Sequence, residues 1–192
     1  FALAIESDAR TIARRMRADG ASKVAIVGGE SPLMKRFAQT LVAEWILAGG
    51  DPPQTFAFAP TQDGLRVLRR DLAKLPLDGI VIAVEGDDAA LVKTFAPRVP
   101  AWASGQVNQR QDTATLRDLE DVRFVDVMWI VAPDAAAFAG LPRPDYPSAA
   151  LDRLYALGLD AWRVARAFVP APPERLAFDG ATGRVELTDS RQ

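Results

Sequence analysis

Residues 23–32 of the chain read Lys-Val-Ala-Ile-Val-Gly-Gly-Glu-Ser-Pro, an apolar run that ends in two glycines and is followed by serine and proline. The apolar run predicts a buried β-strand. Ser31 suits the N-cap of a helix, and Pro32 suits its first position. Apolar side chains then recur at helical spacing as far as Trp45, and Gly49-Gly50 would end the helix. The segment therefore predicts a strand–helix unit of an α/β protein.

The same alternation continues on both sides of this unit. Before it, a helix is predicted after Ser7, with Gly20 at its end. After it, helical segments separate three predicted strands, at 55–59, 79–84 and 99–103. The second of these is the most hydrophobic run and is expected to be central, whereas Pro100 places the third at an edge or marks its first residue. The pattern predicts an α/β fold with a Rossmann-like, doubly wound and mostly parallel sheet.

The sequence changes in character after the third of these strands. Residues 104–121 are mostly polar and predict a surface excursion or a crossing between two lobes. A longer strand is predicted at 122–131, and a connector rich in proline and alanine follows at 133–147. No internal repeat stands out.

The last part of the chain predicts a helix and a hairpin. The helix would carry one apolar stripe, formed by Leu151, Leu154, Tyr155, Gly158, Leu159 and Trp162. The turn Gly180-Ala-Thr-Gly183 joins two short segments, 175–179 and 184–188, which are expected to pair as a closing hairpin. Trp129 and Trp162 are interpreted as packed side chains, since a large apolar surface on a strand or helix is usually buried.

Composition excludes several classes of function. The 192 residues include 49% hydrophobic and 25% charged side chains, with a net charge of −2, so no basic surface is expected for nucleic acid. No apolar run reaches the roughly 18 residues that a membrane span requires. The chain has no cysteine and no histidine. We therefore expect no thiolate nucleophile, no metal site, no cofactor and no catalytic centre.

Two strand ends carry carboxylates that suggest binding chemistry. Gly28-Gly29-Glu30 lies where a strand meets a helix, but its spacing is not that of a dinucleotide or phosphate loop, and an ordinary turn is favoured. Glu85-Gly86-Asp87-Asp88 offers carboxylates for a divalent cation, although Asp87 and Asp88 also suit the N-cap and first turn of a helix. Glu30 and Glu85 together keep open a glycosidase-type pair of acids.

A third candidate site follows the strand at 99–103. It consists of four residues at alternate positions, Trp102, Ser104, Gln106 and Asn108. Their side chains suit hydrogen bonds to a small polar ligand or to a protein surface. A solvated loop has the same composition, so both interpretations stay open.

Three stretches of the second half resemble one protein family. Residues 118–129 (Asp-Leu-Glu-Asp-Val-Arg-Phe-Val-Asp-Val-Met-Trp), residues 153–162 (Arg-Leu-Tyr-Ala-Leu-Gly-Leu-Asp-Ala-Trp) and the turn Gly-Ala-Thr-Gly-Arg184 look like the C-terminal domain of the LppC lipoproteins, the penicillin-binding protein activators. One position departs from the family, because Gln106 stands where members have a histidine at a strand end. This departure weakens a ligand role for that position.

The resemblance implies a type 1 periplasmic-binding-protein fold, of which this sequence holds one lobe and part of the other. Residues 1–108 would form most of the second lobe. Residues 109–168 would form a crossover with hinge and first-lobe material, and 169–192 the closing strands. The remaining first-lobe sequence and the site of lipid attachment are expected to lie outside this chain.

The resemblance also implies a function. Members are outer-membrane lipoproteins that face the periplasm and stimulate a class A penicillin-binding protein in peptidoglycan synthesis. The implied role is non-enzymatic contact with the ectodomain of that synthase, at a periplasmic location and through an N-terminal lipid anchor. The alternative is a solute receptor for a small polar ligand, such as an amino acid or a muropeptide. For such a ligand Ser104 would supply a hydroxyl and Asp126 a carboxylate.

Overall fold

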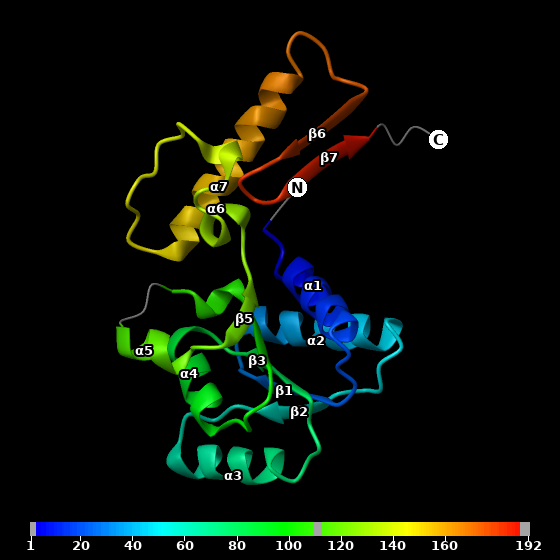
Figure 1. Cartoon of the computed structure of the whole chain (residues 1–192), viewed down its shortest axis with the longest axis vertical. Coiled ribbons are helices and arrows are strands. Elements are labelled where there is room, and N and C mark those ends of the chain that lie inside the picture. Colours follow the sequence, from blue (N-terminus) through cyan, green and yellow to red (C-terminus); the bar gives the residue numbers. More distant parts are fainter. Residues whose placement is uncertain (1–2, 110–112, 189–192) are drawn as a thin grey trace. The chain divides into compact units, whose positions relative to one another are not determined.

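The computed structural model of the chain (Figure 1) describes residues 3–109 and 113–188. They form two compact units. We call Ala4–Val125 the sheet unit, and Phe1–Leu3 together with Asp126–Gln192 the helix–hairpin unit. The border between Val125 and Asp126 differs from the predicted segment boundaries at 108 and 168, and the assignment of those segments to lobes remains a prediction. Residues 110–112 of the predicted polar excursion lie outside the described residues.

Five parallel strands form the core of the sheet unit. They are β1 (Val24–Gly28), β2 (Gln54–Ala57), β3 (Gly79–Ala83), β4 (Ala101–Ser104) and β5 (Val122–Val125). Their order is β2-β1-β3-β4-β5, and each neighbouring pair is parallel. The predicted doubly wound, parallel α/β sheet is therefore confirmed, with β3 as its central strand.

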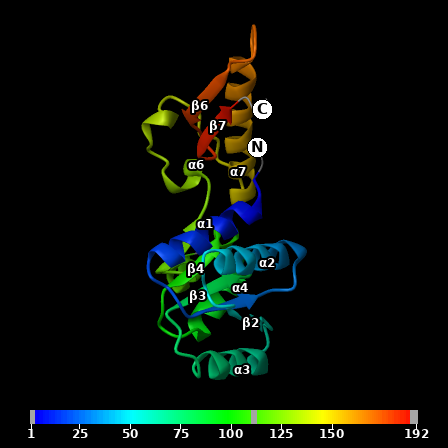
Figure 2. The same cartoon turned by 90° about the vertical axis from the view of Figure 1, so that its right-hand side faces the viewer.

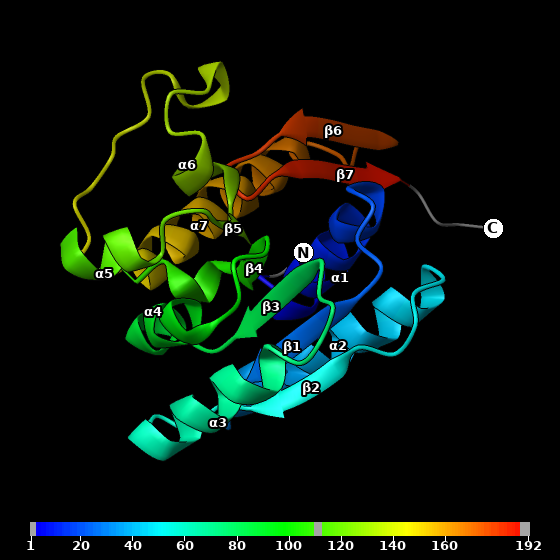
Figure 3. The ribbon, with the colours of Figure 1, turned by 60° about the horizontal axis from the view of Figure 1, so that its bottom comes forward.

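Helices cover both faces of this sheet (Figure 3). In its described residues the sheet unit has the helices α1 (Ile5–Ala18), α2 (Pro32–Leu47), α3 (Gln62–Leu72), α4 (Gly86–Phe95) and α5 (Thr113–Asp118), and the short 3₁₀ turn η1 (Gly105–Val107). Alternate strand residues point to opposite faces. Accordingly, Ile26 and Val81 pack with α1 and α2, whereas Val27 and Ile82 pack with α3 and α4. Figure 2 shows α3 on the side of β2 away from α2.

Local signals for three of these elements agree only in part with the structure. The Ser31 hydroxyl caps α2 as predicted, accepting the Met34 amide at 3.2 Å. The first helix, however, begins at Ile5 rather than after Ser7, because Ile5 is buried in the core and the helix starts three residues earlier. The strand after Pro100 begins at Ala101, one residue later than the alternative that made Pro100 its first residue. The edge alternative is wrong, because the strand lies inside the sheet between β3 and β5.

The predicted strand at 122–131 is too long. Strand β5 ends at Val125, and the chain then forms a short helix, α6 (Met128–Val131). The Asp126 carboxylate accepts the Val127 amide at 2.8 Å, and the Trp129 amide donates to the Ala181 carbonyl at 2.8 Å. These two bonds join residues 126–129 to the helix–hairpin unit, where Val127 and Trp129 pack in a separate core.

The helix–hairpin unit has its own small core. Its elements are α6, the short turn η2 (Ala136–Phe138), α7 (Ala149–Ala167) and the antiparallel strands β6 (Arg175–Asp179) and β7 (Arg184–Thr188). The helix at 149–167 and the closing hairpin confirm the predictions. Trp129 is 3% exposed and lies against Phe138, Tyr155 and the Arg143 guanidinium, as expected for a packed side chain.

The prediction that Trp162 is packed is wrong. Its side chain is 56% exposed, and Leu154 of the same stripe is 57% exposed. The buried residues of α7 include Ala149, Arg153, Ala156 and Asp160, and of the predicted stripe Tyr155 and Leu159 pack partly against the same core. The Arg166 guanidinium lies 4.9 Å from the centre of the Trp162 ring. Two charged side chains of the buried face are bonded within this unit, and these bonds fix which face of the helix turns inward.

Asp78 joins the starts of two strands at the amino edge of the sheet. Its carboxylate accepts the Ser22 hydroxyl at 2.8 Å and the amides of Ser22 and Lys23 at 3.0–3.1 Å. Burial raises the pKa of Asp78, but the Ser22 hydroxyl and the two amides outweigh it, so the pKa lies below its ordinary value. The carboxylate therefore stays charged and holds the segment before β1 against the segment before β3.

This bond network predicts a pH dependence. Because the folded pKa lies below the unfolded value of about 3.9, Asp78 stabilises the fold above that pH, and the contribution is lost as the pH falls through the folded pKa. We expect Asp78→Asn to lower the urea midpoint at about pH 7, and the difference from wild type to shrink below about pH 4. The matched control is Asp63→Asn, whose exposed side chain faces Arg66 at 3.7 Å and should change the midpoint little. A difference that stays constant with pH would contradict this account.

Candidate functional site

The carboxyl edge of the sheet contains a topological switch point. Helix α2 follows β1 and packs on one face, whereas α4 follows the neighbouring strand β3 and packs on the other. The two connections diverge, and ligands of open α/β sheets bind in the space that such a divergence leaves. The residues that end β1 and β3 are therefore the first place to look for a site.

Glu30, Ser31 and Glu85 meet at this point. The Ser31 hydroxyl donates to the Glu85 carboxylate at 2.8 Å, and the Lys35 ammonium lies 2.6 Å from the Glu30 carboxylate. With their neighbours they line a cavity of about 210 Å³, which we call the carboxyl-edge site. Its lining consists of Gly29, Glu30, Ser31, Met34, Phe58, Pro60, Val84, Glu85 and Asp88. The structure thus brings both predicted carboxylates to one small cavity with a partly apolar wall.

Gly29 lets the first connection pass close to β3. Its amide donates to the Ala83 carbonyl at 2.9 Å, and a Cβ at this position would lie 3.2 Å from the Val84 side chain. A side chain there would require Val84 to move by a few tenths of an ångström. Gly29 therefore serves a close backbone approach, whereas a Cβ at Gly28, the last residue of β1, would meet nothing within 4 Å. The segment forms a strand–helix turn of the ordinary kind.

The acidic segment after β3 mainly begins a helix. Glu85 is the N-cap of α4, and Asp87 and Asp88 lie in its first turn, where the helix dipole favours negative charge. Within the described residues, no group of three acidic side chains is arranged to hold a metal ion. Glu30 and Glu85 are both exposed, whereas the general acid of a glycosidase lies where its charge is disfavoured. The geometry thus gives neither a cation site nor a pair of catalytic acids any support.

Ser104, Gln106 and Asn108 lie at the carboxyl end of β4. Ser104 is 1% exposed, and its hydroxyl accepts the Gln106 amide at 3.3 Å, which caps η1. The side-chain amide of Gln109 donates to the backbone and side-chain oxygens of Gln106 at 3.0 and 3.2 Å. Gln106 and Asn108 are half-buried. These side chains form an ordered polar turn at the same edge of the sheet as the carboxyl-edge site.

Trp102 lies apart from this polar turn. It packs with α1 and α2 and lines a different cavity at the amino ends of the strands, together with Asp78 and Pro100. We call this the amino-edge cavity. The four predicted residues therefore do not form one site. The Trp102 side chain lies at one end of β4, and the other three residues lie at or beyond the opposite end.

Asp126 belongs to the helix–hairpin unit. Its carboxylate accepts two bonds from the Arg153 guanidinium, at 2.8 and 2.7 Å, and the side chains are 2% and 9% exposed. The same carboxylate also accepts the Val127 amide. Its hydrogen-bonding capacity is thus engaged by this unit. Sequence reasoning noted Arg153 only within a family-like stretch, and no local signal pairs it with a carboxylate 27 positions earlier.

Comparison with known proteins gives two kinds of match. No family model matches the chain. The penicillin-binding protein activator LpoA of Edwardsiella piscicida is 24% identical over an alignment of 237 residues, which includes 99% of this chain and 34% of that protein. The chain therefore spans about a third of the length of this curated relative.

Two solved structures share the fold over nearly the whole chain. One is a branched-chain amino acid ABC transporter protein from Chromobacterium violaceum ATCC 12472, which is 30% identical, with a TM-score of 0.84 over 98% of this chain and 62% of that one. The other is the LpoA C-domain from Haemophilus influenzae, described as a regulator of PBP1A. It is 18% identical, with a TM-score of 0.74 over 95% of this chain and 59% of that one.

The sheet order and these matches define the class of the chain as a periplasmic-binding-protein-like α/β domain, as predicted. The chain is similar over nearly its whole length to the penicillin-binding protein activator LpoA, which confirms the resemblance noted in its sequence. In the described part of the chain, no helix combines the length and apolar character needed to cross a membrane.

Proposed function

We propose that this chain is the periplasmic-binding-protein-like part of an LpoA-type activator. It binds the ectodomain of a class A penicillin-binding protein in the periplasm and raises peptidoglycan synthesis without catalysing a reaction. The observation that carries the proposal is the match to LpoA along 99% of the chain, together with the fold it shares with an LpoA C-domain described as a regulator of PBP1A. Anchoring to the outer membrane through a lipid is part of the same proposal.

The proposed mechanism is allosteric. An activator that binds the active conformation of its synthase more tightly than the inactive one shifts the population toward activity. A typical coupling of about 1–3 kcal/mol corresponds to roughly 5- to 150-fold tighter binding of the active state. The carboxyl-edge site is compatible with this role, because exposed polar side chains can bind a protein surface without catalysing a reaction.

The test is direct binding of the chain to the ectodomain of a class A penicillin-binding protein from the same organism. We expect saturable binding in calorimetry or interferometry, and faster glycan-chain growth and cross-linking at saturation. The control is an equal amount of chain unfolded beforehand by heat. A folded sample that neither binds nor accelerates synthesis would overturn the proposal for these residues.

A solute receptor is the second candidate, because the Chromobacterium violaceum protein, described as part of a branched-chain amino acid transporter, shares the fold with the higher TM-score. A ligand that binds only the folded state raises the melting temperature by mass action. A millimolar panel of amino acids and muropeptides distinguishes the two functions. A receptor gains stability selectively with one member of the panel, whereas an activator shows no selective gain among them.

A further inference from the structure

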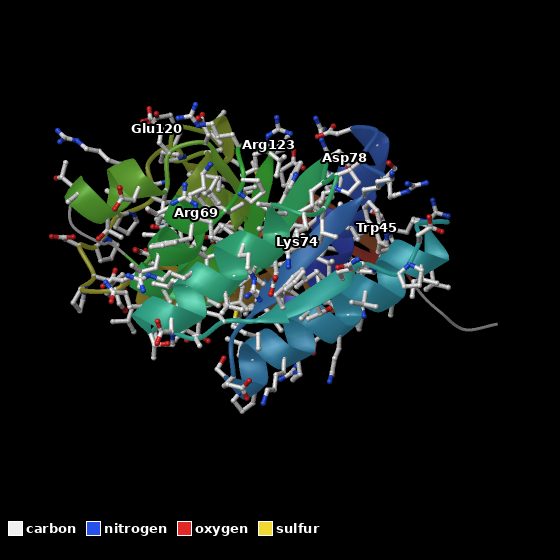
Figure 4. All side chains as sticks on the ribbon, turned by 90° about the horizontal axis from the view of Figure 1, so that it is seen from below. Trp45, Arg69, Lys74, Asp78, Glu120 and Arg123 are labelled. Atoms are coloured by element: carbon white, nitrogen blue, oxygen red, sulfur yellow. The ribbon has the colours of Figure 1, made fainter. Side chains whose placement is uncertain are left out.

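The amino-edge cavity is distinct from the carboxyl-edge site. It has a volume of about 530 Å³, which is within the usual range for small-molecule sites. The last turn of α1 and the loop after it form one wall, and the residues just before β3 and β4, with the second residues of β4 and β5, form the other. The lining residues are Arg15, Met16, Asp19, Gly20, Ala21, Asp78, Pro100, Trp102 and Arg123. Figure 4 shows this edge of the sheet from below, with Asp78 and Arg123 labelled.

Two guanidinium groups are held in place in this cavity by one carboxylate. Arg15 Nε lies 3.0 Å from Asp19 Oδ1, and Arg123 Nη1 donates to Asp19 Oδ2 at 3.2 Å. Each guanidinium has five N–H donors, and Asp19 takes up only part of this capacity. The Arg15 and Arg123 side chains are 67% and 54% exposed, so their remaining donors can be reached from solvent.

The other walls offer flat apolar surface and few available acceptors. The Arg123 guanidinium lies 5.1 Å from the centre of the Trp102 ring, which fixes both groups at the rim. Met16 and Pro100 add apolar surface. The Asp78 carboxylate is already bonded to Ser22 and Lys23. The cavity thus presents donors and apolar surface, and its carboxylates are engaged by the protein.

We propose that the amino-edge cavity binds a small organic carboxylate. Arg15 and Arg123 would hold the charged group, since planar guanidinium groups match carboxylates in geometry and charge. The apolar part of the ligand would lie against Trp102 and Pro100. This site is independent of the proposed contact with a synthase, and it uses Trp102, which the carboxyl-edge site leaves out.

Titration of the full chain with benzoate tests the site, because benzoate combines one carboxylate with a flat apolar ring. The reporter is the indole N–H signal of Trp102 in ¹H–¹⁵N spectra, assigned by its loss in Trp102→Phe. We expect a saturable shift of that signal, with a dissociation constant on the order of 1 mM for so small a ligand. Benzamide has the same shape without the charge and should bind about tenfold more weakly.

Two variants and a control locate the site. Arg123→Gln and Arg15→Gln should each weaken benzoate about tenfold, since each removes a charged donor. Arg123 lies over the Trp102 ring, whereas Arg15 pairs with Asp19, so the Arg15 variant guards against loss of affinity through a displaced indole. Arg36→Gln, which removes an exposed arginine paired with Glu6 elsewhere in the sheet unit, should leave affinity unchanged. An unmoved Trp102 signal, equal binding of benzamide, or equal weakening by Arg36→Gln would each overturn the proposal.

Discussion

An Asp160→Ala variant is expected to lose about 3–5 kcal/mol from the stability of the helix–hairpin unit. The Asp160 side chain is 0% exposed and lies beneath the hairpin turn. It accepts the Ala181 amide at 2.8 Å, and the Thr182 amide and hydroxyl at 2.7 Å each. Alanine would leave these donors unpaired in a buried place, and an unpaired buried donor costs more than its hydrogen bond is worth.

The turn is built closely around this carboxylate. A Cβ at Gly180 would lie 2.5 Å from an Asp160 oxygen, so only glycine fits there without displacing the carboxylate. A two-stranded hairpin is marginal by itself and needs packing against another element. The carboxylate therefore joins β6 and β7 to α7, and its removal should loosen the whole hairpin rather than one bond.

Urea denaturation and amide hydrogen exchange would measure this loss. The amides of Ala181 and Thr182 should exchange much faster in Asp160→Ala, while those of the central strand β3 should not change. The matched control is Thr182→Ala, which removes the hydroxyl donor and keeps both amide bonds, and should cost about 1 kcal/mol. If the two variants lost the same stability, the carboxylate would not be the anchor of the turn.

The second large effect is expected from breaking the ion pair between Asp126 and Arg153, which should lower the stability of the helix–hairpin unit. Arg153→Met leaves the Asp126 carboxylate, which is 2% exposed, without the guanidinium that bonds both of its oxygens. Removing one partner of a buried pair typically costs about 3–5 kcal/mol, because the other charge stays buried. We expect a loss of this size in the stability of the helix–hairpin unit, measured by urea denaturation.

A double variant separates the cost of one unpaired buried charge from the contribution of the ion pair itself. Asp126→Leu combined with Arg153→Met replaces both charges by apolar side chains and should recover most of the loss. The surface control is Arg14→Met, since Arg14 pairs with Glu44 at 2.7 Å but is 68% exposed, and it should cost between about 0 and 1 kcal/mol. A double variant as unstable as the single one would mean that Asp126 is needed for more than charge balance.

The bonds of Asp126 and Ser104 also bear on the candidate functions. Asp126 directly follows β5 at the border of the units, and Arg153 holds it to α7. Its carboxylate is therefore committed to structure, which weakens its predicted role toward an amino acid. Ser104 caps a turn and is almost fully buried, so it too serves the fold first. The solute-receptor alternative would have to rely on other groups, of which the exposed Glu30 and Glu85 are the nearest to a switch point.

The sequence by itself determined the sheet unit in most respects. Continuous apolar runs mark β1 and β3 as strands buried on both faces. The Ser31-Pro32 cap and the glycines mark where the second helix of this unit begins and ends. These signals are local, since caps and strand periodicity act over a few residues. The shared carboxyl edge of Glu30 and Glu85 followed from parallel strand order alone, and the structure places both there.

Only the tertiary structure decided the rest. The Asp126–Arg153 pair joins residues 27 positions apart and Asp160 binds a turn 21 positions later, so neither leaves a local pattern. These buried charges select which face of α7 turns inward and leave Trp162 exposed, against its apolar character. Hydrophobicity alone cannot predict which of two helix faces is buried when one face carries charged side chains that form buried ion pairs or hydrogen bonds. That choice depends on desolvation and hydrogen bonding, which exist only once the distant partners have been brought together.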